Sequence, residues 1–183
     1  VFLLGAEDAV IDSKNIAYKY SKIQNCKQEL EAVKRKWKDT LERLQVYTPI
    51  ESMNIMLNGW ALYQTISSRL YGRTGFYQSG GAYGFRDQLQ DTLCLKYTNP
   101  NKVKEQIIKH SMHQFIEGDV EHWWHEETSR GIRTKFSDDL LWLPFMVEEY
   151  IEATGDSEIL EIKTPYLQGE VLKEDEEERY DLY

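Results

Sequence analysis

Two shortages narrow the class of protein before any motif is considered. The 183-residue sequence holds two cysteines, Cys26 and Cys94, and no CxxC pair. Two separated cysteines cannot form a disulfide framework, so the composition either favours a reduced, cytoplasmic location or carries no information on the compartment. No apolar run approaches the length of a membrane-spanning helix and no signal peptide stands out, so we expect no membrane contact in this segment.

Basic residues are also in short supply. Lys and Arg total 22 against 31 Asp and Glu, which gives a formal charge of −9. An acidic chain does not attract a phosphate backbone, so nucleic acid is not an expected partner. The stretch KEDEEERYD at 173–181 holds six of the 31 acidic residues, and this local excess predicts a solvated, disordered tail. Hydrophobic residues make up 41% of the chain, which is enough for a domain with a core.

Strand signals are scarce as well. The first residues, VFLLGAED, read as a buried strand, but no alternating pattern follows that could pair with it. Because the sequence also begins without Met, we expect a piece of a larger protein. The coarse prediction is an all-α array of helix pairs joined by long loops. Apolar spacing predicts helices over 13–20, 26–44, 49–73, 85–97, 100–116 and 138–153, the last ended by Gly155. Asn25, Thr48 and Asn99 are predicted to cap the second, third and fifth of these helices, and Asp156 is predicted to start one more short helix or turn.

The longest predicted loop, residues 117–135, concentrates side chains that are difficult to bury. Within it, His122 and His125 are three residues apart and are followed by Glu126 and Glu127. This is not the HExxH pattern of a zinc enzyme, and a third ligand at a suitable distance is not evident. We therefore expect no metal here.

The same loop suits a carbohydrate. Flat indole rings pack on the apolar C–H face of a sugar, while imidazole, hydroxyl and guanidinium groups bond its hydroxyls or an anion. Two adjacent Trp cannot both face one core from a helix, so at least one is expected to line a groove, although core packing is the simpler role. The candidate sugar-binding residues are His122, Trp123, Trp124, His125 and Thr128, and the candidate phosphate-binding residues are Arg130 and Arg133.

The segment FRDQLQD places charge at the start of a predicted helix. Asp87 suits the positive end of the helix dipole, and Asp91, four residues on, shares its face. Carboxylates one turn apart cannot easily straddle a sugar ring as the acid and base of a hydrolase do. Binding of sugar hydroxyls by Asp87 and Asp91 with Arg86 is the better interpretation. The alternative is an Arg86–Asp87 ion pair that ties the loop down.

A glycine-rich loop, GFYQSGGAYGF, precedes this helix. It has neither the dinucleotide-binding spacing nor a GK[ST] phosphate motif. The loop is either a flexible turn or a place where the backbone passes close to a ligand. Arg69, Arg73 and Arg86 lie around it and favour a local anion site, with scattered surface arginines as the alternative.

Three separated stretches resemble one enzyme family. They read TPIESMNIMLNGWALYQT, RTGFYQSGGAYGFRDQLQD and HWWHEETSRGIRTKFSDDLLWLPFMVEEYIEATGD. In this order, over nearly the whole chain, they resemble glycoside hydrolase family 94, the inverting phosphorylases of cellobiose, cellodextrin and chitobiose. The wording of HWWHEETSRGIRT and GAYGFRDQLQD is closest to the phosphorylase-like region of cyclic β-1,2-glucan synthases.

That resemblance implies an architecture. Members of the family have an N-terminal β-sandwich, a helical linker and an (α/α)6 barrel. Residues 1–12 would end the sandwich, residues 13–47 would be the linker, and residues 48–183 would form the first half of the catalytic barrel. Half a barrel leaves apolar helix faces uncovered, so we expect self-association, in the simplest case as a homodimer.

The resemblance also implies a reaction without a cofactor. Inorganic phosphate, as co-substrate, attacks the anomeric carbon of a β-glucan or β-linked disaccharide while a carboxylic acid protonates the leaving oxygen, and a sugar 1-phosphate forms. The family's acid lies in a WND-type motif that this sequence lacks, so the acid is expected beyond Tyr183 and this chain alone is expected to be inactive.

Two residues match the family positions that hold the sugar, Asp87 and Arg73. The loop between Arg73 and Arg86 is shorter than in the cellobiose enzymes, and an Arg that contacts phosphate there is replaced by Gly80-Gly81-Ala82. Arg133 is the candidate replacement for that phosphate contact.

Two other functions stay open. One is the phosphorylase-like domain of a cyclic β-1,2-glucan synthase, whose parent protein would be membrane-bound. The other is a non-catalytic helical module that binds a sugar or a protein partner. A WND-type acid in the parent sequence would argue against the second.

Overall fold

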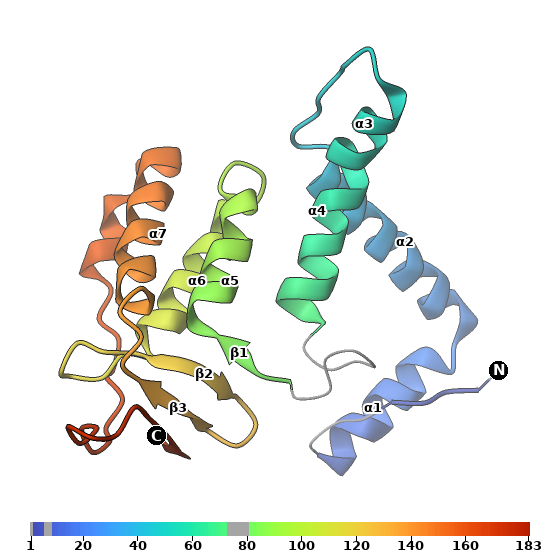
Figure 1. Ribbon diagram of the computed structural model, residues 1–183. Helices are drawn as coiled ribbons and strands as arrows, with labels where there is room; N and C mark the ends of the chain where they lie inside the picture. The colour runs from blue at the N-terminus through green and yellow to red at the C-terminus, as the bar shows by residue number, and fades with distance from the viewer. Residues whose placement is uncertain (1, 6–8, 73–80) are drawn as a thin grey trace. The chain divides into compact units, whose positions relative to one another are not determined.

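Two compact units make up the protein. The structure, a computed structural model, describes residues 2–5, 9–72 and 81–183. The units span Val1–Arg43 and Leu44–Tyr183. Figure 1 shows the chain coloured from its N-terminus to its C-terminus.

The first unit is a pair of helices, α1 (Val10–Tyr20) and α2 (Ile23–Leu41). Asn25, which was predicted to cap the second helix, lies inside its first turn and donates from Nδ2 to the carbonyl of Lys19 at 2.8 Å. Residues 2–5 form no strand, so the prediction of a strand at the start is wrong for these residues. A strand needs a partner to pair its backbone groups, and the described part of this unit offers none.

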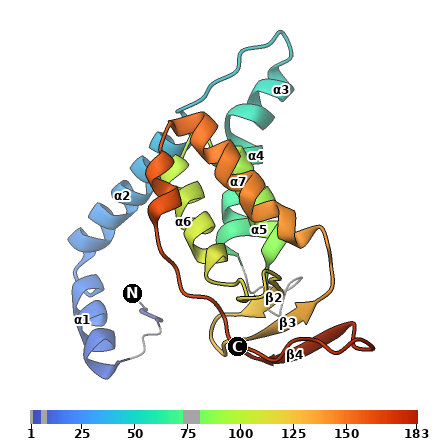
Figure 2. The same ribbon diagram turned by 90° about the vertical axis from the view of Figure 1, so that its left-hand side faces the viewer.

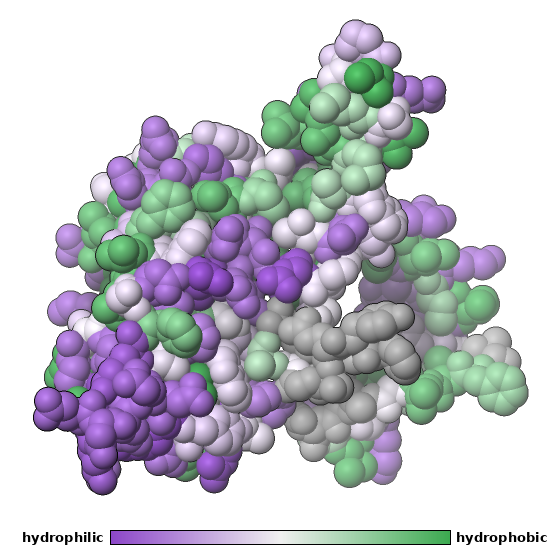
Figure 3. All heavy atoms as spheres, in the orientation of Figure 1, coloured by the Kyte–Doolittle hydropathy of each residue, from purple (hydrophilic) through white to green (hydrophobic). Residues whose placement is uncertain are grey.

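The second unit opens with a helical rod. It consists of α3 (Glu51–Ile55), η1 (Met56–Trp60), α4 (Ala61–Gln64) and η2 (Thr65–Tyr71), and both η segments have π-helical turns. Apolar side chains are exposed along the rod, as Figure 3 shows over α3 and η1. They include Met53, Met56, Leu57 and Trp60.

Two amide side chains, one helical turn apart, hold the chain that leads into the rod. Asn54 accepts from the backbone N–H of Thr48 at 2.8 Å and donates to its carbonyl at 2.9 Å. Asn58 makes the same pair of bonds with Val46, at 2.7 and 2.8 Å. Thr48 therefore does not cap the helix as predicted, and Ile50 stands at the N-cap position without a side-chain bond.

Three helices form the main layer of the second unit. They are α5 (Phe85–Thr92), which η3 (Leu93–Leu95) extends, α6 (Pro100–Ser111) and α7 (Asp139–Thr154). Figures 1 and 2 show the three side by side above a small sheet. Their facing sides bury the core residues Phe85, Leu89, Val103, Ile107 and Met146, each 3% exposed or less.

The ends of these helices follow the sequence signals. Asn99 accepts from the N–H of Lys102 and so caps α6, with Pro100 at the first helical position. Gly155 ends α7 in the left-handed conformation, with φ of 73°, which favours glycine. Asp156 then accepts from the N–H of Glu158 and starts η4 (Ser157–Glu161), as predicted.

A four-stranded antiparallel sheet lies under the helices. Its order is β1-β2-β3-β4. The all-α prediction is therefore wrong in part, because the predicted loop 117–135 is a β-hairpin and the acidic tail supplies a strand. The strands are β1 (Tyr83–Gly84), β2 (Glu121–His125), β3 (Arg130–Thr134) and β4 (Glu178–Leu182).

Buried charged residues are the reason that the sequence pattern did not predict this hairpin. Glu121 and Arg133 pair across β2 and β3 and are 2% and 0% exposed, so no polar–apolar alternation marks the strands. A bulge between Glu121 and Trp123 further breaks the period of two. Gly131 is required beside them, because a Cβ there would lie 1.7 Å from Oε1 of Glu121 and 2.6 Å from the carbonyl of Trp123.

The acidic segment is ordered by specific bonds. Lys135 Nζ donates to the carbonyls of Lys173 and Glu174, at 3.1 and 2.9 Å, and Arg179 forms an ion pair with Glu176. Figure 3 shows the hydrophilic surface that this segment makes at the lower left. Among the described helices, none combines the length and the apolar character needed to cross a membrane.

One histidine is fully buried where α6 meets the sheet. His110 has Nδ1 at 2.7 Å from the carbonyl of Gln106, and its ring makes edge contacts with Phe85 and Trp124 at centroid distances of 5.4 and 5.3 Å. Burial lowers the pKa of His110 to about 3. The imidazole is therefore neutral near pH 7, and Nδ1 donates to Gln106.

We predict that His110 makes the fold acid-sensitive. In the unfolded chain it takes up a proton near pH 6.5, whereas in the folded protein it does so only near pH 3. Between these two pH values, protonation of His110 in the unfolded chain lowers the free energy of unfolding by about 1.4 kcal/mol for each pH unit of acidification. His110→Asn keeps a donor for Gln106 and does not titrate. Urea unfolding at stepped pH should give a shallower fall for this variant, and equal slopes would contradict the assignment.

Candidate functional site

The shortest strand brings two distant candidate segments together. β1 pairs with β2 so that Gly84 lies opposite Trp123 and Tyr83 opposite Trp124. Because α5 starts directly after Gly84, its first turn lies at the edge of the sheet next to β2. The segment with Arg86 and Asp87 and the segment with the two Trp thus meet at one edge, although about 35 residues separate them in sequence.

Two adjacent carboxylates at the start of α7 join these segments. Arg86 Nη1 lies 2.8 Å from Oδ2 of Asp138, and His122 Nδ1 lies 2.6 Å from Oδ2 of Asp139. We call these four residues the double clamp. Arg86 and Asp138 are about half exposed, whereas the Asp139 side chain is 2% exposed. A guanidinium group and an imidazole group are therefore held by neighbouring residues of one helix N-terminus.

The two clamp carboxylates experience different surroundings. Burial raises the pKa of Asp139, and the hydrogen bond and charge of His122 oppose that rise. On the exposed side, the hydrogen bond to Asp138 raises the pKa of Arg86. Neither carboxylate caps α7, since the N-cap residue Asp138 makes no side-chain bond to the helix backbone. Both side chains are used to hold groups from other elements.

Asp87 presents an exposed carboxylate beside the double clamp. It lies exposed in the first turn of α5, and its side chain has no ion pair or hydrogen bond within the described residues. The carboxylate folds back over Gly84, where a Cβ would lie 2.9 Å from Oδ2 of Asp87. The alternative of an Arg86–Asp87 ion pair does not hold, because Arg86 bonds Asp138.

Asp91 has a different role from Asp87. Its Oδ2 lies 2.7 Å from Nε of Arg69, which joins α5 to the helical rod at η2. Arg73, predicted to contact the sugar, lies outside the described residues.

The two adjacent Trp face opposite sides of the sheet. Trp124 is 1% exposed and lies between the rings of Tyr83 and His113, at centroid distances of 5.8 and 3.7 Å. The burial of this ring favours a structural role for Trp124 over the predicted sugar contact. Trp123 lies on the other face, against His125 and Tyr180, and is partly exposed.

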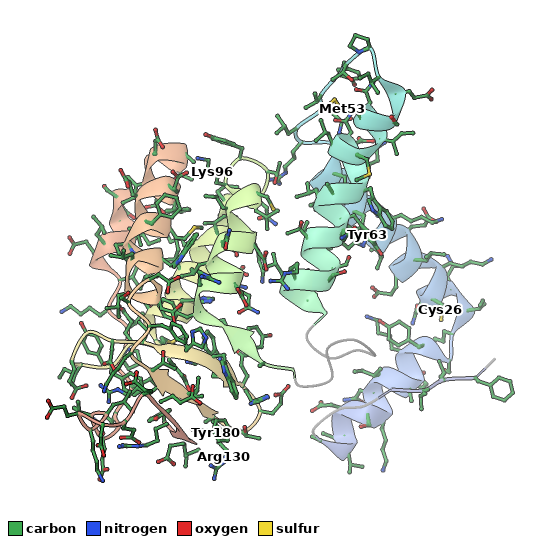
Figure 4. All side chains as sticks on the ribbon, in the orientation of Figure 1. Cys26, Met53, Tyr63, Lys96, Arg130 and Tyr180 are labelled. Atoms are coloured by element: carbon green, nitrogen blue, oxygen red, sulfur yellow. The ribbon has the colours of Figure 1, made fainter. Side chains whose placement is uncertain are left out.

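The remaining loop candidates lie near the hairpin turn. Thr128 is exposed in the turn itself, and Arg130 is exposed at the start of β3. Figure 4 shows Arg130 beside Tyr180 at the edge of the sheet that lies away from the three helices. The turn is at the opposite end of β2 from Glu121, so Thr128 and Arg130 do not join the double clamp.

Arg133 is the most completely bonded side chain of the site region. Its Nε and Nη2 bond both carboxylate oxygens of Asp119 at 2.6 Å, and Nη2 also bonds Glu117 at 3.0 Å. Nη1 donates to the carbonyls of Gly169 and Glu170. All five N–H groups are therefore used, and the guanidinium also packs on Phe115 at 3.9 Å. The geometry favours a structural role for Arg133 over the expected phosphate contact.

Sequence reasoning missed the residues that complete the site. Asp138 and Asp139 were read only as a helix start. A helix needs one capping residue, so the second acidic residue was the signal that could have indicated another role. Glu121 and His113 were missed because their 2.7 Å bond is buried under the hairpin. No group of three or more metal-ligating side chains occurs in the part of the chain that the structure describes.

We predict that removal of Arg133 destabilises the protein strongly. Arg133→Ala leaves two carbonyls and the carboxylates of Asp119 and Glu117 without their donor, and because the two carboxylates are themselves partly exposed the loss should be about 1–3 kcal/mol. Arg130→Ala, on the same strand but exposed, is the matched control and should cost less than about 0.5 kcal/mol. Urea unfolding followed by circular dichroism measures both, and similar values for the two variants would refute the structural role.

The chain is similar to known carbohydrate-active enzymes. The catalytic domain of the glycosyl hydrolase 94 superfamily matches residues 36–176. Cyclic β-(1,2)-glucan synthase NdvB of Rhizobium meliloti (strain 1021) is 42% identical over 151 residues, which are 82% of this chain and 5% of that protein. N,N′-diacetylchitobiose phosphorylase of Vibrio proteolyticus is 25% identical over 178 residues, 82% of this chain and 22% of that protein.

A third relative is solabiose phosphorylase of Paenibacillus borealis, 31% identical over 127 residues, which are 69% of this chain and 15% of that protein. The chain thus spans less than a quarter of the length of each of these relatives. The matched region contains the double clamp, Asp87 and the whole hairpin. The chain belongs to the glycosyl hydrolase 94 superfamily, which it matches in the catalytic domain.

Proposed function

We propose that this chain supplies part of the sugar-binding surface of an enzyme that performs inverting phosphorolysis of β-glucosides or β-glucans. The observation that carries the proposal is the meeting of Asp87, Arg86 and Trp123 at the β1–β2 edge. An exposed carboxylate without a partner accepts bonds from sugar hydroxyls, and a partly exposed indole packs on the apolar face of the ring. Family membership supports the same reading.

Phosphate serves as the co-substrate in this proposal, and no cofactor is needed. Phosphate attacks the anomeric carbon while a carboxylic acid of the parent protein, outside this chain, protonates the leaving oxygen. Since the donors of Arg133 are all used, the phosphate contacts are assigned to groups beyond the described residues. The helices from residue 48 onward would form the first half of an (α/α)6 barrel, preceded by a linker at 13–47, in a cytoplasmic enzyme.

A second candidate has support from one comparison. The 42% identity to cyclic β-(1,2)-glucan synthase NdvB favours a phosphorylase-like domain within a glucan synthase. Both candidates use the same sugar-binding surface, and they differ in what the parent protein does with the bound glucan. Linkage preference and phosphate dependence separate them.

We predict the following outcome for the parent protein that contains this segment. Incubation with phosphate and β-1,2-linked glucose oligosaccharides or cellobiose should release α-glucose 1-phosphate, the anomer that inversion of a β-bond requires. Proton NMR of the anomeric signals reads both the product and its configuration. Release of free sugar at the same rate without phosphate would refute phosphorolysis. Binding of sugar without turnover would favour the non-catalytic module.

We also predict that sugar affinity depends on the Asp87 carboxylate. Hydrogen bonds to a charged group contribute about 1.5–3 kcal/mol, so Asp87→Ala should weaken binding roughly 10- to 100-fold. Gly84→Ala should weaken it too, because the added methyl would lie 2.9 Å from Oδ2 of Asp87 and would displace the carboxylate. Gln90→Ala, exposed on the same helix, is the control. Titration with a β-linked oligosaccharide measures the affinities, and equal values for all three variants would remove Asp87 from the site.

A further inference from the structure

The buried half of the double clamp is unusual for a carboxylate. Asp139 is 2% exposed, and among the described residues His122 is its one hydrogen-bond partner. A buried carboxylate with a single partner is costly, so Asp139 is a candidate for a use beyond packing. Asp138, the adjacent residue, holds Arg86 at the surface.

Two contacts fix the imidazole of His122. The bond to Asp139 sets the direction of Nδ1, and the ring of Phe136 stacks on the imidazole at a centroid distance of 4.7 Å and an interplanar angle of 27°. Hydrogen bond and stack together leave neither the rotation nor the plane of the ring free. His122 also sits at the bulge of β2, next to Trp123.

One ring nitrogen remains available. A carboxylate can only accept, so Asp139 keeps the hydrogen of the imidazole on Nδ1. Nε2 has no hydrogen-bond partner in the described part of the chain, and the side chain is 35% exposed. The neutral ring therefore presents Nε2 as an acceptor of fixed orientation.

We propose that Asp139 is a positioning residue that orients His122, so that Nε2 of His122 accepts a hydrogen bond from a hydroxyl of the bound sugar. The proposal rests on the proposed function for the identity of the ligand. The same two side chains could instead serve only to staple β2 to α7. The two roles make different demands on Nε2: sugar binding requires it, whereas a purely structural contact between β2 and α7 requires only the Nδ1 bond to Asp139.

The first test reads the ring directly in this chain. Nitrogen-15 NMR of the histidine rings distinguishes a hydrogen on Nδ1 from one on Nε2. In the wild-type chain the neutral form of His122 should carry it on Nδ1. Asp139→Asn, which keeps the shape of the side chain but can also donate, should shift part of the population to the Nε2 form. An unchanged tautomer in this variant would overturn the orienting role of Asp139.

The second test separates Nε2 from the staple. His122→Asn keeps an amide donor near the position of Nδ1 and so keeps the bond to Asp139, but it has no atom at the position of Nε2. We expect its urea midpoint to stay close to the wild-type value and its affinity for a β-1,2-linked glucose disaccharide to fall about 10-fold. His122→Gln places an amide near the position of Nε2 and should recover part of that affinity.

The outcomes keep the two proposals apart. A His122→Asn variant that binds the disaccharide as tightly as the wild type would show a staple only and overturn the contact. If both His122 variants unfold, Asp139→Asn in the NMR test still decides the orienting role. If the folded wild-type chain binds no sugar, the proposed function and the Nε2 contact both fail, while the tautomer result stands for Asp139 by itself.

Discussion

The pairing of two residues, Tyr83 and Gly84, with β2 is the constraint on which the site depends. This strand anchors the chain directly before α5, so the N-terminus of that helix lies against the hairpin. Without the pairing, Asp87 would still stand in a favourable helix dipole, but nothing would bring it to Trp123. The stack of Tyr83 on the buried Trp124 adds apolar contact to the same two-residue ladder. A short strand is sufficient here because ring packing supplements its few backbone bonds.

Buried charges determine how the sheet and helices fit together. Arg133, Glu121 and Asp139 each lie in the interior, and each bonds a side chain from another part of the fold, although Oε1 of Glu121 has no hydrogen-bond partner among the described residues. Such groups add little net stability compared with apolar residues, but they tolerate only one arrangement of their neighbours. Arg133 illustrates this, since its five donors fix the hairpin, the segment around Asp119 and the backbone at 169–170 at once.

The sequence predicted the helices well and the strands poorly, for physical reasons. Asn99-Pro100 and Gly155 act locally, so their caps could be read without knowing the fold. Membership in the glycosyl hydrolase 94 superfamily was also visible, because the residues of three motifs and their order can be read without knowing the fold. The hairpin was not, since its charged interior positions acquire partners only in the folded state. For the same reason Trp124 could not be told from Trp123 until the strand gave the two residues opposite faces.

The charged strand at the end of the sheet has one more consequence. β4 is the outermost strand in the described part of the sheet, so one row of its backbone N–H and C=O groups faces outward. Such a row is a template on which other polypeptides can add and begin to aggregate. Glu178, Arg179 and Asp181 place full charges along it, and an incoming strand would have to desolvate them. The charges of this segment therefore oppose the addition of a further strand to β4, and their removal would expose the sheet edge to aggregation.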